Sequence, residues 1–237
     1  MSEPSVSPEE FSRVFSIIRE TPGEYLEKKS LAVLQAFWTG YTDRDGTHAG
    51  LRIFSPDGFH EFVNEKYRND SSHNAVSVIN LYVPDCEGSW SRYFELLDEF
   101  SCREREPVQP AASPRPSPEF RELLLLVINR PALFVGNSCF SLIAAFINGW
   151  LRATADLQYK ESDYERKFVR LLKYIETFDI NLPGPSWNSI IWFWTMHDDG
   201  AIELLKQYID EYIDQEKGWI QRIEYQMQRR LDSRGTV

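Results

Sequence analysis

The chain of 237 residues has few cysteines and no long apolar run. Its three cysteines, Cys86, Cys102 and Cys139, are too few and too scattered for a disulfide framework. Its longest apolar stretches, such as residues 123–128, fall far short of the roughly 20 residues that a bilayer-spanning helix needs. The opening MSEPSVSPEEF contains neither the basic nor the apolar segment of a secretory signal. These absences predict a cytoplasmic protein.

Sequence motifs for catalysis and for metal binding are missing as well. There is no GxxxxGK[ST], GxGxxG or GxSxG pattern, so no phosphate-binding loop or nucleophile elbow is expected. His48, His60, His73 and Cys86 follow one another at twelve or thirteen residues, which is not the close spacing that metal ligands on one helix or turn require. We therefore predict no catalytic residue, no cofactor and no metal site.

Acidic residues outnumber basic ones. Twenty-six Lys and Arg face 36 Asp and Glu, which gives a formal net charge of −10 and a pI of about 5.0. This balance argues against nucleic acid and against anionic membrane surfaces as partners, because both would be repelled. It permits electrostatically steered association with a basic protein. Because 42% of the residues are hydrophobic, the chain can bury a proper core.

A repeated pattern organises the chain. Residues 21–41, TPGEYLEKKSLAVLQAFWTGY, match residues 130–150, RPALFVGNSCFSLIAAFINGW, at an offset of 109 positions. In both copies a proline precedes an aromatic or apolar pair, and an apolar run ends in Ala-Phe-x-x-Gly-aromatic. Near the end of each half, Glu-Leu-Leu at 95–97 recurs at 203–205. Because order and spacing are both kept, we interpret the pattern as an internal duplication; two unrelated amphipathic halves are the alternative.

The segment PVQPAASPRPSP at 107–118 holds five prolines and is typical of a semi-extended linker. It separates a first helical unit, 1–106, from a second unit, 119–237. We predict a mainly α fold in which two tandem copies of a helical unit of about 110 residues pack together. The polar positions of segment 24–29 differ from those of 133–138, and a binding face is expected where the copies diverge.

Helical periodicity predicts about five helices in each half. One helix is expected over 30–38, ended by Gly40, and its counterpart over 138–147, ended by Gly149. Cys139 is interpreted as a small buried residue of that counterpart. Segments 74–83 and 187–196 fit either a helix or a strand, and a helix is favoured in both. The last helix is expected from 201 to about 230, with the Asp198-Asp199-Gly200 turn as its N-cap.

The aromatic group around Trp192 is the most distinctive local feature. Residues two apart on a helix diverge by about 200°, so Trp192 and Trp194 are not expected to face the same core. Burial between the two units and a solvated acidic helix face are the alternatives to a partner-binding role. The predicted partner-binding residues are Trp192, Trp194, Asp198, Asp199, Glu203, Asp210, Glu211 and Asp214.

The repeated Pro-x-x-aromatic and Ala-Phe-x-x-Gly-aromatic pattern resembles a unit of poorly characterised bacterial proteins, some of which are immunity proteins encoded beside polymorphic toxins. The resemblance implies a non-catalytic protein that binds a basic cognate toxin and covers its active site. From the acidic charge we expect no nucleic acid and no membrane partner, and the chain is expected to be a monomer or a homodimer. A hydrolase that reverses a toxin's modification and a helical scaffold or regulatory module remain the alternatives.

Overall fold

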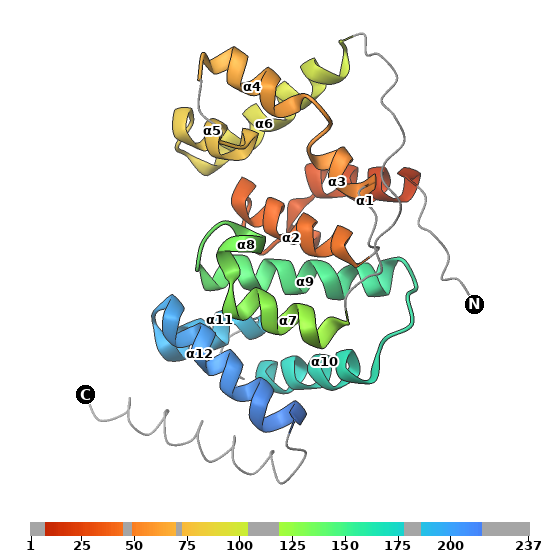
Figure 1. The fold of residues 1–237 in the computed structure, drawn as a ribbon, viewed down its shortest axis with the longest axis vertical. Helices are drawn as coiled ribbons and strands as arrows, with labels where there is room; N and C mark the ends of the chain where they lie inside the picture. The colour runs from red at the N-terminus through yellow and green to blue at the C-terminus, as the bar shows by residue number, and fades with distance from the viewer. Residues whose placement is uncertain (1–7, 45–48, 70–72, 104–118, 178–185, 215–237) are drawn as a thin grey trace.

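The structure, a computed structural model, describes residues 8–44, 49–69, 73–103, 119–177 and 186–214. Every regular element within these ranges is a helix, so the predicted mainly α class is confirmed (Figure 1). None of the described helices has both the length and the apolar content needed to cross a lipid bilayer. The predicted linker, 107–118, lies outside the described residues.

Helices of the two halves follow one another in a similar order. The first half contains α1 (Pro8–Glu20), the 3-10 turn η1 (Pro22–Glu24), α2 (Leu31–Asp43), α3 (Ala49–Phe54), α4 (Phe59–Tyr67), α5 (Ala75–Tyr82) and α6 (Cys86–Ser101). The second half contains α7 (Phe120–Asn129), α8 (Pro131–Val135), α9 (Phe140–Asp156), α10 (Asp163–Glu176), α11 (Trp187–Thr195), α12 (Asp198–Ile209) and the π-helical turn η2 (Asp210–Asp214). The duplication itself stays a prediction.

The helix α3 has no counterpart in the second half. There α9 runs for 17 residues, and the described segment 157–162 that joins it to α10 contains no helix. The short helices α3 and α8 were not predicted, because six and five residues are too few to establish a helical period.

The helices α2 and α9 lie side by side at the centre of the molecule, with the first half on one side and the second half on the other (Figure 1). Gly40 and Gly149 sit inside these helices, so the prediction that they end them is wrong. A Cβ added to Gly40 would overlap the backbone of Phe146, and one added to Gly149 would overlap the backbone of Phe37. The repeated Phe-x-x-Gly therefore lets two backbones touch, reciprocally, at one helix crossing.

Two hydrophobic clusters fill the molecule. The N-terminal core is built on α1 to α6, and the C-terminal core on α7 to α12. The N-terminal core also takes in Leu142, Ala145 and Ala153 from α9 and Leu157 from the segment that follows it. The two halves are therefore packed against each other, as predicted, and α9 contributes apolar side chains to both cores.

The ambiguous segments are helices, as favoured. The side chain of Asn74 accepts a hydrogen bond from the Ser77 amide at 2.9 Å and so caps α5. The helix α11 follows an extended Ser186 and buries Trp187, Ile190 and Ile191 at helical spacing. β-branched residues are tolerated in both helices because these positions are buried by tertiary packing, which outweighs their modest intrinsic cost.

The predicted N-cap of the last helix is wrong. Its N-cap is His197, whose ring Nδ1 accepts a hydrogen bond from the Gly200 amide at 2.9 Å, and not the Asp198-Asp199-Gly200 turn. The α-helix ends at Ile209, where the π-helical turn begins. The rest of the predicted helix, from residue 215 to about 230, lies outside the described residues.

Candidate functional site

The α11–α12 hairpin carries the predicted partner-binding residues. Trp192 is 44% exposed, whereas Trp194 is half-buried and packs against the C-terminal core. The two indoles therefore have different surroundings, as their spacing predicts. Neither tryptophan is fully buried, which removes the alternative that the whole aromatic group fills the contact between the halves.

Two further exposed apolar side chains lie on the same hairpin and were not predicted. Phe193 is 44% exposed, and Met196, in the link between α11 and α12, is 58% exposed. We call Trp192, Phe193 and Met196 the hairpin apolar cluster. The sequence signal was the density of apolar residues over 190–196, which exceeds what one helix face can bury.

Asp198 has a structural role that the sequence did not indicate. Its Oδ1 accepts a hydrogen bond from the backbone amide of Phe140, the first residue of α9, at 3.1 Å. The N-cap residue of α9, Cys139, makes no capping bond with its own side chain. Asp198 therefore caps a helix that lies 58 residues earlier in the chain, where its negative charge also meets the positive end of the helix dipole. The interpretation of Cys139 as buried is wrong, since it is partly exposed.

The remaining acidic residues lie along the hairpin in different settings. Asp199 and Asp210 are exposed, and Glu203 is exposed and paired with Lys206 at 3.6 Å. Glu211 is half-buried and accepts a hydrogen bond from the Gln207 side chain at 2.9 Å. The side chain of Asp214, the last residue of η2, lies outside the described part.

The divergent polar segment 24–29 makes a hydrogen bond to the second half, and its Glu24, Glu27 and Lys28 are exposed. Glu27 accepts a hydrogen bond from the side chain of Asn188, on α11, at 2.6 Å. In the second copy, Leu133 on α8 is 74% exposed. Its counterpart at the offset of 109 positions, Glu24, is exposed as well, and the binding face expected where the copies diverge stays a prediction.

A cavity of about 510 Å³ lies within the first half, between α2, α3, α4, α5 and α6. Its lining includes Ser55, Asp57 and His60, the residue types of a nucleophile relay. The geometry does not form one. Nδ1 of His60 accepts a hydrogen bond from the Ala75 amide at 3.2 Å, so in the neutral ring the proton is on Nε2. That nitrogen is the one near Ser55 Oγ, at 3.5 Å, and it is therefore a donor there, not a general base.

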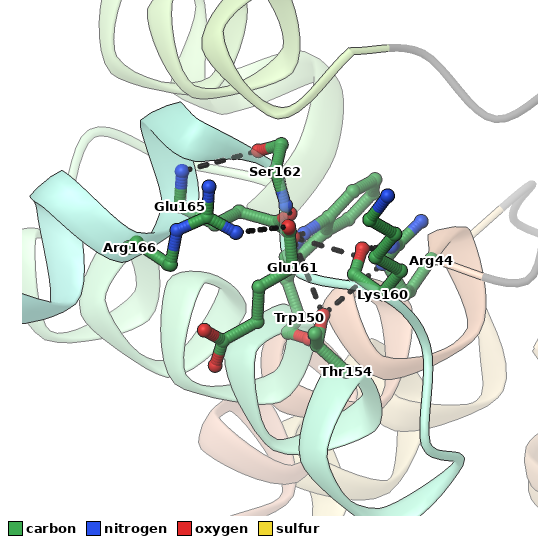
Figure 2. A network of polar contacts seen from close by, with 8 residues as sticks. All are labelled: Arg44, Trp150, Thr154, Lys160, Glu161, Ser162, Glu165 and Arg166. Atoms are coloured by element: carbon green, nitrogen blue, oxygen red, sulfur yellow. Dashed lines mark hydrogen bonds and ion pairs between the residues drawn. The ribbon is translucent and has the colours of Figure 1, made fainter.

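A buried polar network joins the two halves near the C-terminal ends of α2 and α9 (Figure 2). Arg44, which is 9% exposed, approaches Glu165, which is 2% exposed, with 3.7 Å between Nε and Oε1. The same guanidinium donates to Thr154 Oγ1 at 3.1 Å and lies over the Trp150 ring at 5.3 Å from its centroid. These contacts tie the C-terminal end of α2 to two helices of the second half, α9 and α10.

Glu165 is also held by a side chain of α9 and by the N-cap residue of its own helix, α10. Its carboxylate accepts hydrogen bonds from Trp150 Nε1 at 2.8 Å and from the Ser162 amide at 2.6 Å. The Ser162 hydroxyl accepts in return from the Glu165 amide at 3.1 Å, which completes a capping box at the start of α10. Every oxygen of the carboxylate is thus used, and the network is a structural clamp between the halves.

Within the described ranges, no group of three or more His, Cys, Asp and Glu side chains is placed to hold a metal ion. No protein-family model, no curated protein and no solved structure matches the chain. The functional interpretation therefore depends on the hairpin apolar cluster, the cavity and the charge distribution.

Proposed function

We propose that this chain is a non-catalytic binding protein of the immunity type, which neutralises a bacterial toxin by covering the toxin's active site. The hairpin apolar cluster is the observation that carries the proposal. Trp192, Phe193 and Met196 expose about half of their surfaces within five residues of one another. Aromatic residues and Met are enriched at protein interfaces. A partner that buried these three side chains would remove their apolar surface from water, which is favourable in free energy.

The charge around this cluster favours a basic partner. The exposed carboxylates of Asp199 and Glu203 lie on α12 and that of Asp210 on η2, and Lys206 is the one basic residue among positions 198–214. A toxin that acts on an anionic substrate presents a basic groove, which such carboxylates would attract and occupy. The resemblance of the repeated unit to immunity proteins supports the same choice of partner.

The test is a binding measurement between the purified chain and the toxin encoded by an adjacent gene. Trp192→Ala is expected to weaken the complex at least 30-fold, since an interface tryptophan anchor contributes about 2 kcal/mol or more. Leu81→Ala is the matched control, because Leu81 is 67% exposed on α5, away from the hairpin. It should change the dissociation constant by less than about threefold.

The acidic residues are tested separately by the kinetics. The double variant Asp199→Asn/Glu203→Gln should slow association and reduce its salt dependence, while dissociation changes little. A complex that is insensitive to salt, or one that Leu81→Ala weakens more than Trp192→Ala does, would contradict the proposed surface. Absence of a complex with the adjacent toxin would contradict the proposed function itself.

The alternative of a hydrolase has one observation to favour it, the polar cavity of the first half. The relation of His60 to Ser55 in that cavity gives no activated nucleophile, as described above. An enzyme assay with His60→Gln would decide: loss of a measured hydrolysis would favour the enzyme over the binding protein.

A further inference from the structure

The cavity of the first half has the dimensions and the walls of a small-molecule site. Its volume of about 510 Å³ falls within the range of roughly 300–1,000 Å³ typical of ligand pockets. Buried apolar side chains form much of its lining, including Phe54, Phe59, Val76 and Tyr93. The Tyr93 hydroxyl donates to the carbonyl of Phe54, so the phenol ring is fixed and its polar end is satisfied. A ligand with an apolar body would be buried against these rings.

Two opposite charges occur together in this lining. Arg52 and Asp57 approach to 3.4 Å between Nη2 and Oδ2, with 38% and 49% of their side chains exposed. An exposed ion pair of this kind contributes little net stability, so a ligand can replace it with pairs of its own at small cost. Arg52 then offers donors to an anionic group, and Asp57 offers an acceptor to a cationic group.

His60 adds a donor of known orientation. Because its Nδ1 accepts from the Ala75 amide, the neutral ring carries its proton on Nε2, near Ser55 Oγ at 3.5 Å. The long separation makes this a weak contact that an oxygen of a ligand could replace. The cavity therefore presents a cation, an anion and a neutral donor within nine residues of sequence.

We propose that this cavity binds a small zwitterion, an α-amino acid with an apolar side chain. A ligand with only a carboxylate would meet Arg52 and His60 but would be repelled by Asp57. A ligand with only an ammonium would meet Asp57 but would be repelled by Arg52. A zwitterion gives each charge a partner, and its apolar side chain has the aromatic walls to bury against. This inference does not depend on the toxin partner.

The position of the cavity supports a dedicated role. Leu51, Arg52 and Phe54 come from α3, the helix that has no counterpart in the second half. The helix α3, which is present only in the first half of the described residues, thus supplies one wall of the cavity and its cation, Arg52.

The test uses three probes of nearly equal size on the full chain. L-phenylalanine carries both charges, 3-phenylpropionate lacks the ammonium, and 2-phenylethylamine lacks the carboxylate. Isothermal titration calorimetry should give L-phenylalanine a dissociation constant at least tenfold lower than that of either analogue. Binding of an analogue as tight as that of L-phenylalanine, or no heat of binding from L-phenylalanine at concentrations up to about 10 mM, would overturn the proposal.

Variants assign the binding to this cavity. Arg52→Gln and Asp57→Asn should each weaken the binding of L-phenylalanine at least tenfold. Asp57→Asn should also reduce the ratio between the dissociation constants of 3-phenylpropionate and L-phenylalanine. Arg13→Gln is the matched control, because Arg13 forms a similarly exposed pair with Glu10 at 3.8 Å on α1. Equal effects of Arg52→Gln and Arg13→Gln would overturn the assignment, whatever the outcome for the toxin complex.

Discussion

Met196 adopts a left-handed backbone conformation, with φ of 62°, at the C-cap of α11. Glycine is the usual residue at such a position, because a Cβ costs on the order of 1 kcal/mol there. The side chain is nevertheless large, apolar and 58% exposed. A residue that is unfavourable for the fold and unfavourable in water points to a use for its side chain, which the proposed interface would supply.

Replacing Met196 with glycine should stabilise the isolated protein by about 0.5–1 kcal/mol, because the backbone strain is relieved. Met196→Ala keeps the unfavourable φ and should give no such gain. Urea denaturation of the three proteins checks the prediction. For toxin binding the substitution should be unfavourable: Met196→Gly should bind the toxin more weakly than the unaltered chain does.

The Arg19–Asp98 pair between α1 and α6 gives a pH dependence with a defined sign. Hydrogen bonds from Arg19, together with its charge, hold the pKa of Asp98 below its usual range. A depressed carboxyl pKa stabilises the fold above the unfolded-state value near 3.9, and this stabilisation is lost as the pH falls through the folded value. Because both side chains are about half exposed, the contribution is limited to about 0.5–1 kcal/mol.

Asp98→Asn should therefore lower the free energy of unfolding by about 0.5–1 kcal/mol at pH 7 and make almost no difference near pH 2. Urea denaturation at the two pH values measures this. Glu61→Gln, on the exposed surface of α4, is the control and should behave like the unaltered protein at both. A destabilisation by Asp98→Asn that is equal at both pH values would show that charge is not its cause.

Some features of individual residues could be predicted from the local sequence, and others depend on tertiary packing. The divergence of Trp192 and Trp194 followed from helix geometry alone and is confirmed. The role of Asp198 depends on a helix end 58 residues away, which no local pattern encodes. Arg52, Asp57 and His60 meet in a cavity bordered by five helices, so their common setting depends on tertiary packing.

The helices show a different mixture. The Pro185-Ser186 sequence favoured a helix in the segment of α11, and the repeat extended that prediction to the segment of α5. Gly40 and Gly149 were recognised as paired positions, but a glycine that ends a helix and one that permits a close crossing give the same local signal. Only the contact between α2 and α9 distinguishes the two roles.

At the scale of these two helices, Gly40→Ala is expected to be costly. The new methyl group would overlap the Phe146 carbonyl, a backbone group that cannot rotate away, so the helices must separate. We expect a loss of about 3 kcal/mol in the free energy of unfolding, at the upper end of overpacking effects. Gly149→Ala should give a similar loss, because its contact with Phe37 is reciprocal.

Gly23→Ala is the matched control for these substitutions. Gly23 has no atom within 4 Å of an added Cβ, so the change should be neutral or slightly stabilising. Thermal melts of the three variants compare the effects directly. A melting temperature of Gly40→Ala equal to that of Gly23→Ala would show that the crossing is looser than described.

For the molecule as a whole, the buried Arg44–Glu165 pair tests how firmly the halves are joined. Arg44→Met leaves the Glu165 charge buried without its partner and should cost about 3–5 kcal/mol. The double variant Arg44→Met/Glu165→Met removes both charges and should be closer to the unaltered protein, with a loss of about 1–2 kcal/mol that includes the capping box.

Urea denaturation of the single variants Arg44→Met and Glu165→Met and of the double variant completes this cycle. Lys206→Met is the control, since its exposed pair with Glu203 should contribute less than about 0.5 kcal/mol. Losses that simply add in the double variant would mean that Arg44 and Glu165 act independently.

The sharing of α9 between the two cores has a consequence for synthesis. A growing chain leaves the ribosome from its N-terminus at about 5–20 residues per second, and its domains begin to fold in that order. The N-terminal core lacks Leu142, Ala145, Ala153 and Leu157 until α9 has emerged. Apolar surface of the first half therefore stays exposed to solvent while residues 107–139 are translated. During that interval we expect the nascent first half to be a substrate for chaperones.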